Sequence, residues 1–98
     1  MNIYQISNPK EGEESFFTLY QTSTIKIEAI RSKLSAPGEM YDQKEDEWVV
    51  LVRGNALLEV EGEEIPLSAG DSLHLKQHVR HRVLATSDDA LWLAVFSS

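Results

Sequence analysis

Short apolar runs separated by turns, rather than any long amphipathic stretch, most constrain how this chain can fold. Residues 24–29 alternate polar and apolar side chains, which is the period of a half-buried β-strand. Turn signals recur at intervals of roughly 8–12 residues, for example at Gly54, Gly62 and Gly70. No stretch has the pattern of a long helix. About eight short strands with this spacing are typical of an all-β sandwich or barrel.

The expected strands follow a polar N-terminal arm at residues 1–14, so that residues 15–98 form a single domain. Their approximate ranges are 16–20, 24–29, 48–52, 56–60, 65–67, 72–75, 82–84 and 90–96. Ile30 breaks the alternation of its strand, which predicts a β-bulge or a change of face. Residues 48–52 are apolar on both faces, which predicts a strand covered by the interior on one side and by a dimer partner or second sheet on the other.

The size of the chain favours self-association. Its 98 residues correspond to one domain, and a domain this small buries only a modest share of its surface. It has no cysteine that could supply a disulfide or a thiolate metal site. Association with a second copy is the remaining way to bury more apolar area, so we expect a homodimer.

The charge balance excludes two classes of partner. The formal net charge is -7, from 16 acidic and 9 basic residues. Nucleic acids and anionic membranes are bound by clustered Lys and Arg, and the nearest cluster, Arg80 and Arg82, is too short. No apolar run approaches the roughly 20 residues of a membrane-spanning helix, and the N-terminus lacks the features of a signal peptide. We therefore expect a cytoplasmic protein that binds neither nucleic acid nor membrane.

The segment 41–81 resembles the cupin superfamily, which carries two spaced motifs. The first cupin motif has two histidines, a glutamate and a glycine, and the matching places here hold Tyr41, Gln43, Glu47 and Gly54. The second has glycine, proline, glycine and histidine, and the matching places hold Gly70, Lys76, His78 and His81. The resemblance implies an RmlC-like jelly roll, which is a small antiparallel β-barrel.

The same resemblance implies a divalent metal, because metal-binding cupins hold one ion with three histidines and a glutamate. In this chain Glu47 and His81 remain, while Tyr41 and Gln43 replace the two histidines of the first motif. The implied metal ligands are therefore Gln43, Glu47 and His81, with Zn, Ni, Fe or Mn as candidate ions. An amide oxygen or a phenol is a weaker ligand than imidazole for such ions.

Three interpretations of Glu47 and His81 remain open. They could hold a metal that Gln43 or water completes. They could form a catalytic acid–base pair, since a partly buried carboxyl group beside a histidine suits proton transfer. They could also hydrogen-bond each other in a site without chemistry. Strand alternation puts Tyr41 and Gln43 on one face, and we expect Tyr41, Gln43 and His78 to contact any ligand.

Two functional hypotheses follow from these interpretations. In the first, a small polar or carboxylated metabolite binds in the barrel interior, with or without a metal, around Glu47 and His81. Any reaction would by resemblance be that of an isomerase, a lyase or a dioxygenase. In the second, the protein is a non-catalytic dimeric sensor or structural module with a metal-free site. The sequence leaves both open, because one fold hosts many unrelated activities.

Overall fold

The structure, a computed structural model, describes residues 1–98 and confirms the all-β expectation. A short 3-10 helix precedes eight strands, and the chain has no helix long and apolar enough to cross a membrane. The elements are η1 (Ile3–Gln5), β1 (Glu13–Gln21), β2 (Ile25–Lys33), β3 (Asp46–Arg53), β4 (Asn55–Val60), β5 (Glu63–Ser68), β6 (Ser72–Leu75), β7 (His81–Thr86) and β8 (Ala90–Ser97).

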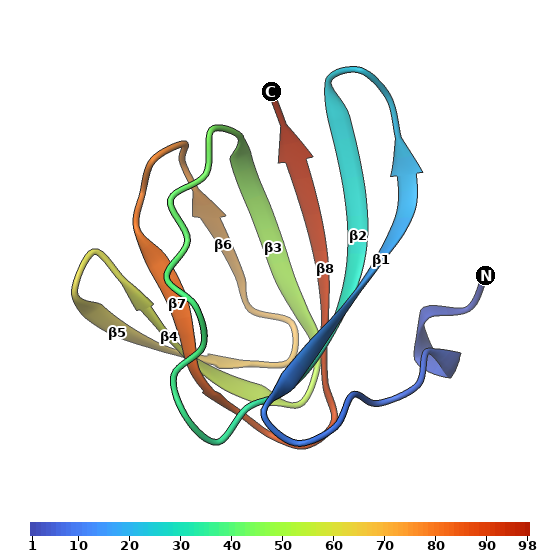
Figure 1. Cartoon of the computed structure of the whole chain (residues 1–98), viewed down its shortest axis with the longest axis vertical. Helices are drawn as coiled ribbons and strands as arrows, with labels where there is room; N and C mark the ends of the chain where they lie inside the picture. The colour runs from blue at the N-terminus through green and yellow to red at the C-terminus, as the bar shows by residue number, and fades with distance from the viewer.

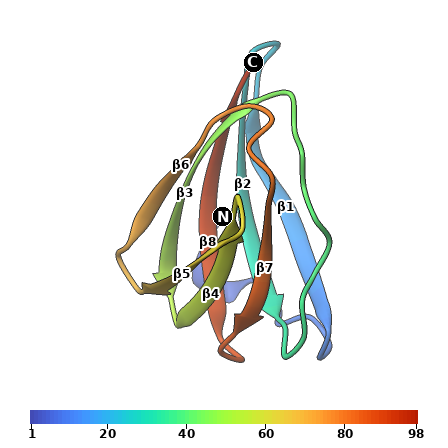
Figure 2. The same ribbon diagram turned by 90° about the vertical axis from the view of Figure 1, so that its left-hand side faces the viewer.

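The strands form two antiparallel sheets that face each other as a jelly roll (Figure 1). The five-stranded sheet has the order β1-β2-β8-β3-β6, and the three-stranded sheet has the order β5-β4-β7. The connection between β2 and β3, residues 34–45, is the longest in the chain. Figure 2 shows it running between β1 of one sheet and β7 of the other. This connection carries two of the residues expected in the site, so its path decides where they lie.

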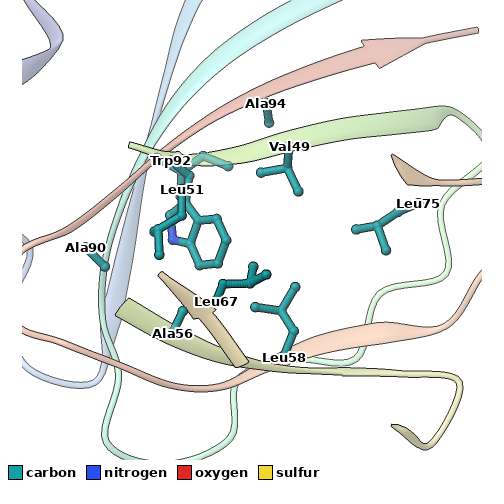
Figure 3. Close-up of a cluster of buried hydrophobic side chains, with 10 residues drawn as sticks. Val49, Leu51, Ala56, Leu58, Leu67, Leu75, Ala90, Trp92 and Ala94 are labelled. Atoms are coloured by element: carbon teal, nitrogen blue, oxygen red, sulfur yellow. The ribbon is translucent and has the colours of Figure 1, made fainter. Parts of the chain in front are cut away.

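The core fills the space between the two sheets. Ten buried hydrophobic residues form one cluster, including Leu51 and Trp92 from the five-stranded sheet and Leu58 from the three-stranded sheet. Figure 3 shows the Trp92 ring and the Leu58 side chain directed into this shared interior. Every second residue of each strand points inward, and Trp92 is buried in this cluster, only 3% exposed.

Two alternatives were predicted at Ile30; the bulge is wrong, whereas the apolar side chains do change face there. β2 pairs with β8 in continuous register from Ile25 to Ser32, and the one irregularity against β1 lies between Thr18 and Tyr20. Ile30 belongs to the core cluster, and its neighbour Arg31 is buried on the other face of the sheet. The apolar–polar alternation is lost at this point because both faces are covered, and the backbone remains regular.

The N-terminal segment covers that second face. Arg31, only 4% exposed, donates through Nη1 to the carbonyl oxygen of Ile6 at 2.7 Å and through Nη2 to Asn8. The Arg53 guanidinium lies 4.7 Å from the ring centroid of Tyr4, within range of a cation–π interaction. β1 begins at Glu13, inside the segment expected to be an arm, and the boundary between arm and domain stays a prediction.

Two turn glycines give a matched test of this fold. Gly54 and Gly62 both have left-handed backbones, with φ of 87° and 81°. A Cβ on Gly54 would lie 3.1 Å from the Cα of Ala90, whereas a Cβ on Gly62 would meet nothing within 4 Å. We expect Gly62→Ala to cost about 1–2 kcal/mol of unfolding free energy, from left-handed strain alone. Gly54→Ala should cost clearly more, and equal losses in urea denaturation would contradict the close approach of β8.

Candidate functional site

A pocket with a volume of about 370 Å³ lies between the two sheets. Sixteen residues line it, and nine of them are hydrophobic. Four residues expected in the site from the sequence are among them: Tyr41, Gln43, Glu47 and His81. The pocket therefore joins residues from β3, β7 and the β2–β3 connection, and its size suits a small molecule.

Backbone hydrogen bonds to β7 and to the β6–β7 loop hold the β2–β3 connection in place. Gly38 N–H donates to the carbonyl of Val83 at 2.8 Å, and Tyr41 exchanges two bonds with His81, at 2.7 and 3.1 Å. His78 N–H donates to the carbonyl of Gln43 at 2.7 Å. The connection is thus extended where Tyr41 and Gln43 stand two residues apart, so both side chains reach the pocket, as the sequence predicted.

Glu47 lies on the inner face of β3 and is only 6% exposed. The side-chain amide of Gln43 donates to its Oε1 at 2.8 Å, and His81 Nε2 lies 3.6 Å from the same oxygen. Burial raises the pKa of the Glu47 carboxyl above its ordinary value, while the Gln43 hydrogen bond and the nearby His81 oppose that rise. A carboxyl group in this state can take up or release a proton near neutral pH more readily than an exposed one.

His81 opens β7 and is 7% exposed. Its Nδ1 lies 3.0 Å from the carbonyl oxygen of Val79. A carbonyl oxygen only accepts, so Nδ1 must carry the hydrogen and donate it. Nε2 is therefore the ring nitrogen that gains or loses a proton, and it is the one that faces Glu47.

Tyr41 packs beside this pair. Its ring lies 5.7 Å from the His81 ring, centroid to centroid, with the planes tilted by 30°. Burial raises the pKa of the Tyr41 phenol, and the carboxylates of Glu14, Glu39, Glu47 and Glu28 raise it further. The phenol consequently stays protonated at neutral pH, where it can donate a hydrogen bond to a ligand but is a poor metal ligand.

The structure does not bring His78 into the pocket. Its side chain is 60% exposed, and its Nδ1 pairs with Asp42 Oδ1 at 2.9 Å. His78 has a left-handed backbone, with φ of 63°, at the place where the second cupin motif has a glycine. The side chain lies against the exposed Asp42, and His78 is not among the residues that line the pocket.

Sequence reasoning missed four charged residues that line the pocket: Glu14, Lys26, Glu28 and Glu45. Glu14 accepts a hydrogen bond from Ser32 Oγ at 2.5 Å, and Trp92 Nε1 donates to the same hydroxyl at 3.0 Å. Burial raises the pKa of Glu14, which the Ser32 bond opposes and Glu39 reinforces. Lys26 and Glu28 also line the pocket, so the polar positions of β2 face inward. The sequence does contain a signal for Glu14: it lies two residues before Phe16, and residues two apart in a strand share a face.

The side chains around Glu47 do not fit the metal site that the family resemblance implies. No three His, Cys, Asp or Glu side chains come together in the chain as a potential metal-binding group. Gln43 turns its N–H, and not its oxygen, toward Glu47. With Tyr41 kept as a neutral phenol, Glu47 and His81 are the only strong donors, whereas a stable divalent site needs three or four protein ligands.

Comparisons with known proteins agree with this architecture. The family model described as Cupin domain matches residues 32–96. A candidate mannose-6-phosphate isomerase from Ralstonia eutropha JMP134 is 36% identical, with a TM-score of 0.88, covering 100% of this chain and 96% of its own. A comparison with curated proteins gives no match.

Two more distant structures share the fold. KdgF from Halomonas sp. is 23% identical, with a TM-score of 0.83 over 99% of this chain and 89% of its own. An RmlC-like cupin from Shewanella frigidimarina is 22% identical, with a TM-score of 0.77 over 92% of this chain and 80% of its own.

The buried carboxyl of Glu47 predicts a specific pH dependence of stability. Its pKa is raised on folding, so ionising it costs folding free energy once the pH rises above the unfolded value of about 4.3. Glu47→Gln removes that cost and keeps an acceptor for Gln43. We expect the variant to have a higher Tm than the parent at pH 8, with the difference shrinking toward pH 4. Glu64→Gln on β5 is the control, and a pH-independent difference would contradict the burial of an ionisable Glu47.

Proposed function

The chain belongs to the Cupin domain family, and from that membership we propose that it binds a small polar molecule in the pocket between its sheets. Glu47 and His81 contact this ligand as a proton-exchanging pair, and no metal takes part. The observation that carries the proposal is the pair itself: two almost fully buried ionisable groups, 3.6 Å apart, at the side of a pocket with mostly apolar walls.

The geometry of the pair suits proton transfer. When the pair holds a single proton, on Glu47 or on His81 Nε2, the protonated group is an acid and the other group is a base. The base takes a proton from the bound molecule and the acid returns one at another atom, so the pair ends with the proton count it began with. Such chemistry belongs to isomerases and lyases. A dioxygenase normally uses iron held by two histidines and a carboxylate, and Tyr41 and Gln43 do not supply that set.

The substrate in the name of the Ralstonia eutropha relative is not carried over to this chain. A phosphate group is usually held by Arg, by several Lys or by a helix N-terminus. Lys26 is the only Lys or Arg that lines the pocket, and its Nζ lies 3.7 Å from Glu28. The same lack of free cations disfavours a carboxylated metabolite.

A nuclear magnetic resonance screen of small polar metabolites tests this function. Ligands should shift the amide resonances of Gln43, Glu47 and His81. Glu47→Gln and His81→Ala should each weaken binding by about 10–100-fold, the loss expected for a hydrogen bond to a charged group, whereas His78→Ala should leave it unchanged. In D₂O the parent should exchange a carbon-bound hydrogen of the ligand, and Glu47→Gln should not. Undiminished binding by His81→Ala would contradict the site.

We also propose that the protein is a homodimer, as the apolar outer face of the five-stranded sheet suggests. Trp48 on that face is 43% exposed, although β3 buries its inner residues. The cross-strand register joins apolar residues there into two rows: Ile27, Val95 and Trp48, and Phe17, Leu93 and Val50, with the fully buried Ala29 between Phe17 and Leu93. A contiguous apolar surface of this kind is typical of an interface.

Sedimentation equilibrium tests the dimer. At micromolar concentration the parent should sediment at twice its chain mass of 11.1 kDa. Trp48→Arg should shift it to the monomer, because a charge would be buried in the interface. Met40→Arg replaces a comparably exposed hydrophobic residue, 39% exposed, on the β2–β3 connection, and it should leave the dimer intact. A monomeric parent would contradict the proposal.

A further inference from the structure

The charges around the pocket indicate which class of molecule it accepts. Its ionisable lining consists of one lysine, one histidine, one tyrosine and four glutamates, which are Glu14, Glu28, Glu45 and Glu47. These carboxyl groups come from β1, β2, the β2–β3 connection and β3, so the fold gathers them from distant parts of the chain. Resting on the proposed function, we infer that the ligand is a primary amine with an apolar body.

The chain already holds one ammonium group in this environment. Lys26, Phe96 and Glu47 stand in register across β2, β8 and β3, and Lys26 and Phe96 both line the pocket. The Lys26 Nζ lies 3.7 Å from a Glu28 oxygen and 5.0 Å from the Phe96 ring centroid. An ammonium group is attracted by both a carboxylate and an aromatic face. Lys26 thus shows that the walls accommodate a cation of the proposed kind.

Lys26 does not neutralise the remaining carboxyl groups. No Lys or Arg lies within ion-pair distance of Glu14, Glu45 or Glu47, and the four ion pairs of the chain involve Glu28, Asp42, Glu47 with His81, and Glu59. The pocket would therefore attract a ligand that carries a positive charge and repel one that carries a negative charge.

The hydrogen-bonding groups of Glu47 and His81 favour the same class of ligand. With Nδ1 committed to Val79, a neutral His81 presents Nε2 as an acceptor, and Glu47 Oε1 faces it at 3.6 Å. This separation is too long for a hydrogen bond between the two, so whichever group lacks the proton of the pair can accept from a third group. An ammonium group offers three N–H donors, whereas a carboxylate or phosphate offers mainly acceptors.

The walls define the rest of the ligand. Phe16, Ile30, Val49, Leu75, Val83 and Trp92 line the pocket alongside Phe96. A ligand that consisted only of a charged group would leave these walls in contact with water, at a cost of about 25 cal/mol per Å² of apolar surface. An aliphatic or aromatic body carrying one terminal amine matches both the apolar walls and the carboxyl groups among them.

Three compounds with one skeleton test the inference: benzylamine, benzyl alcohol and benzoate. We would titrate each into ¹⁵N-labelled protein at 150 mM NaCl and follow the amide resonances of Gln43, Glu47 and His81. Benzylamine should bind at least tenfold more tightly than benzyl alcohol, and benzoate should not shift these resonances. Glu47→Gln should remove most of the preference for the amine over the alcohol, while Glu64→Gln, on the exposed surface of β5, should retain it.

The outcomes separate this inference from the proposal on which it rests. If benzyl alcohol or benzoate shifts the pocket resonances as strongly as benzylamine, the amine assignment is overturned and the ligand pocket stands. If amine-induced shifts appear only outside the pocket, the assignment is likewise overturned. If none of the three compounds, nor any member of the metabolite screen, shifts pocket resonances, both proposals fail.

Discussion

The burial of Glu47 is the constraint on which the rest of the site depends. A carboxyl group at this depth is unfavourable unless hydrogen bonds and nearby charges compensate for lost water. Gln43 supplies the hydrogen bond and His81 supplies the nearby ionisable group. Both are in reach only because the β2–β3 connection is bonded along β7 and the adjoining loop. One buried acid, Glu47, therefore links three features of the site: the extended connection, the tautomer of His81 and the neutral phenol of Tyr41.

The two faces of β2 have different roles. Its polar residues Lys26 and Glu28 face the pocket, while Ile27 and Ala29 belong to the apolar outer face. Over residues 25–29 this is the reverse of an ordinary half-buried strand, in which apolar residues face the interior. The inversion adds two charged residues to the mostly apolar pocket wall and leaves apolar residues on the outer face of the sheet. Ligand binding and self-association are thus proposed for opposite faces of the same sheet.

The sequence predicted the fold class, the approximate strands and four of the pocket residues. Alternation and glycine turns are local patterns, so they can be recognised without knowledge of the tertiary structure. Tyr41, Gln43, Glu47 and His81 were found because their spacing follows the cupin motifs. Glu14 was missed because its partner Ser32 is 18 positions away. The pattern at Ile30 left a bulge and a change of face open, because a local pattern does not show that the N-terminal segment covers Arg31. His78 occupies a motif position by its spacing, but its backbone is left-handed and its side chain is exposed.

Glu47 and His81 are proposed to exchange a proton as one pair. The most direct test of this proposal is a pH titration that follows the Glu47 carboxyl carbon and the His81 ring by nuclear magnetic resonance, with a chelator present. We predict that Glu47 titrates above the exposed glutamates, that its step also appears in the His81 ring signals, and that Glu47→Gln removes that step. If Glu47 titrates with the exposed glutamates, or if the His81 signals do not report its step, the two groups are independent and do not act as a pair.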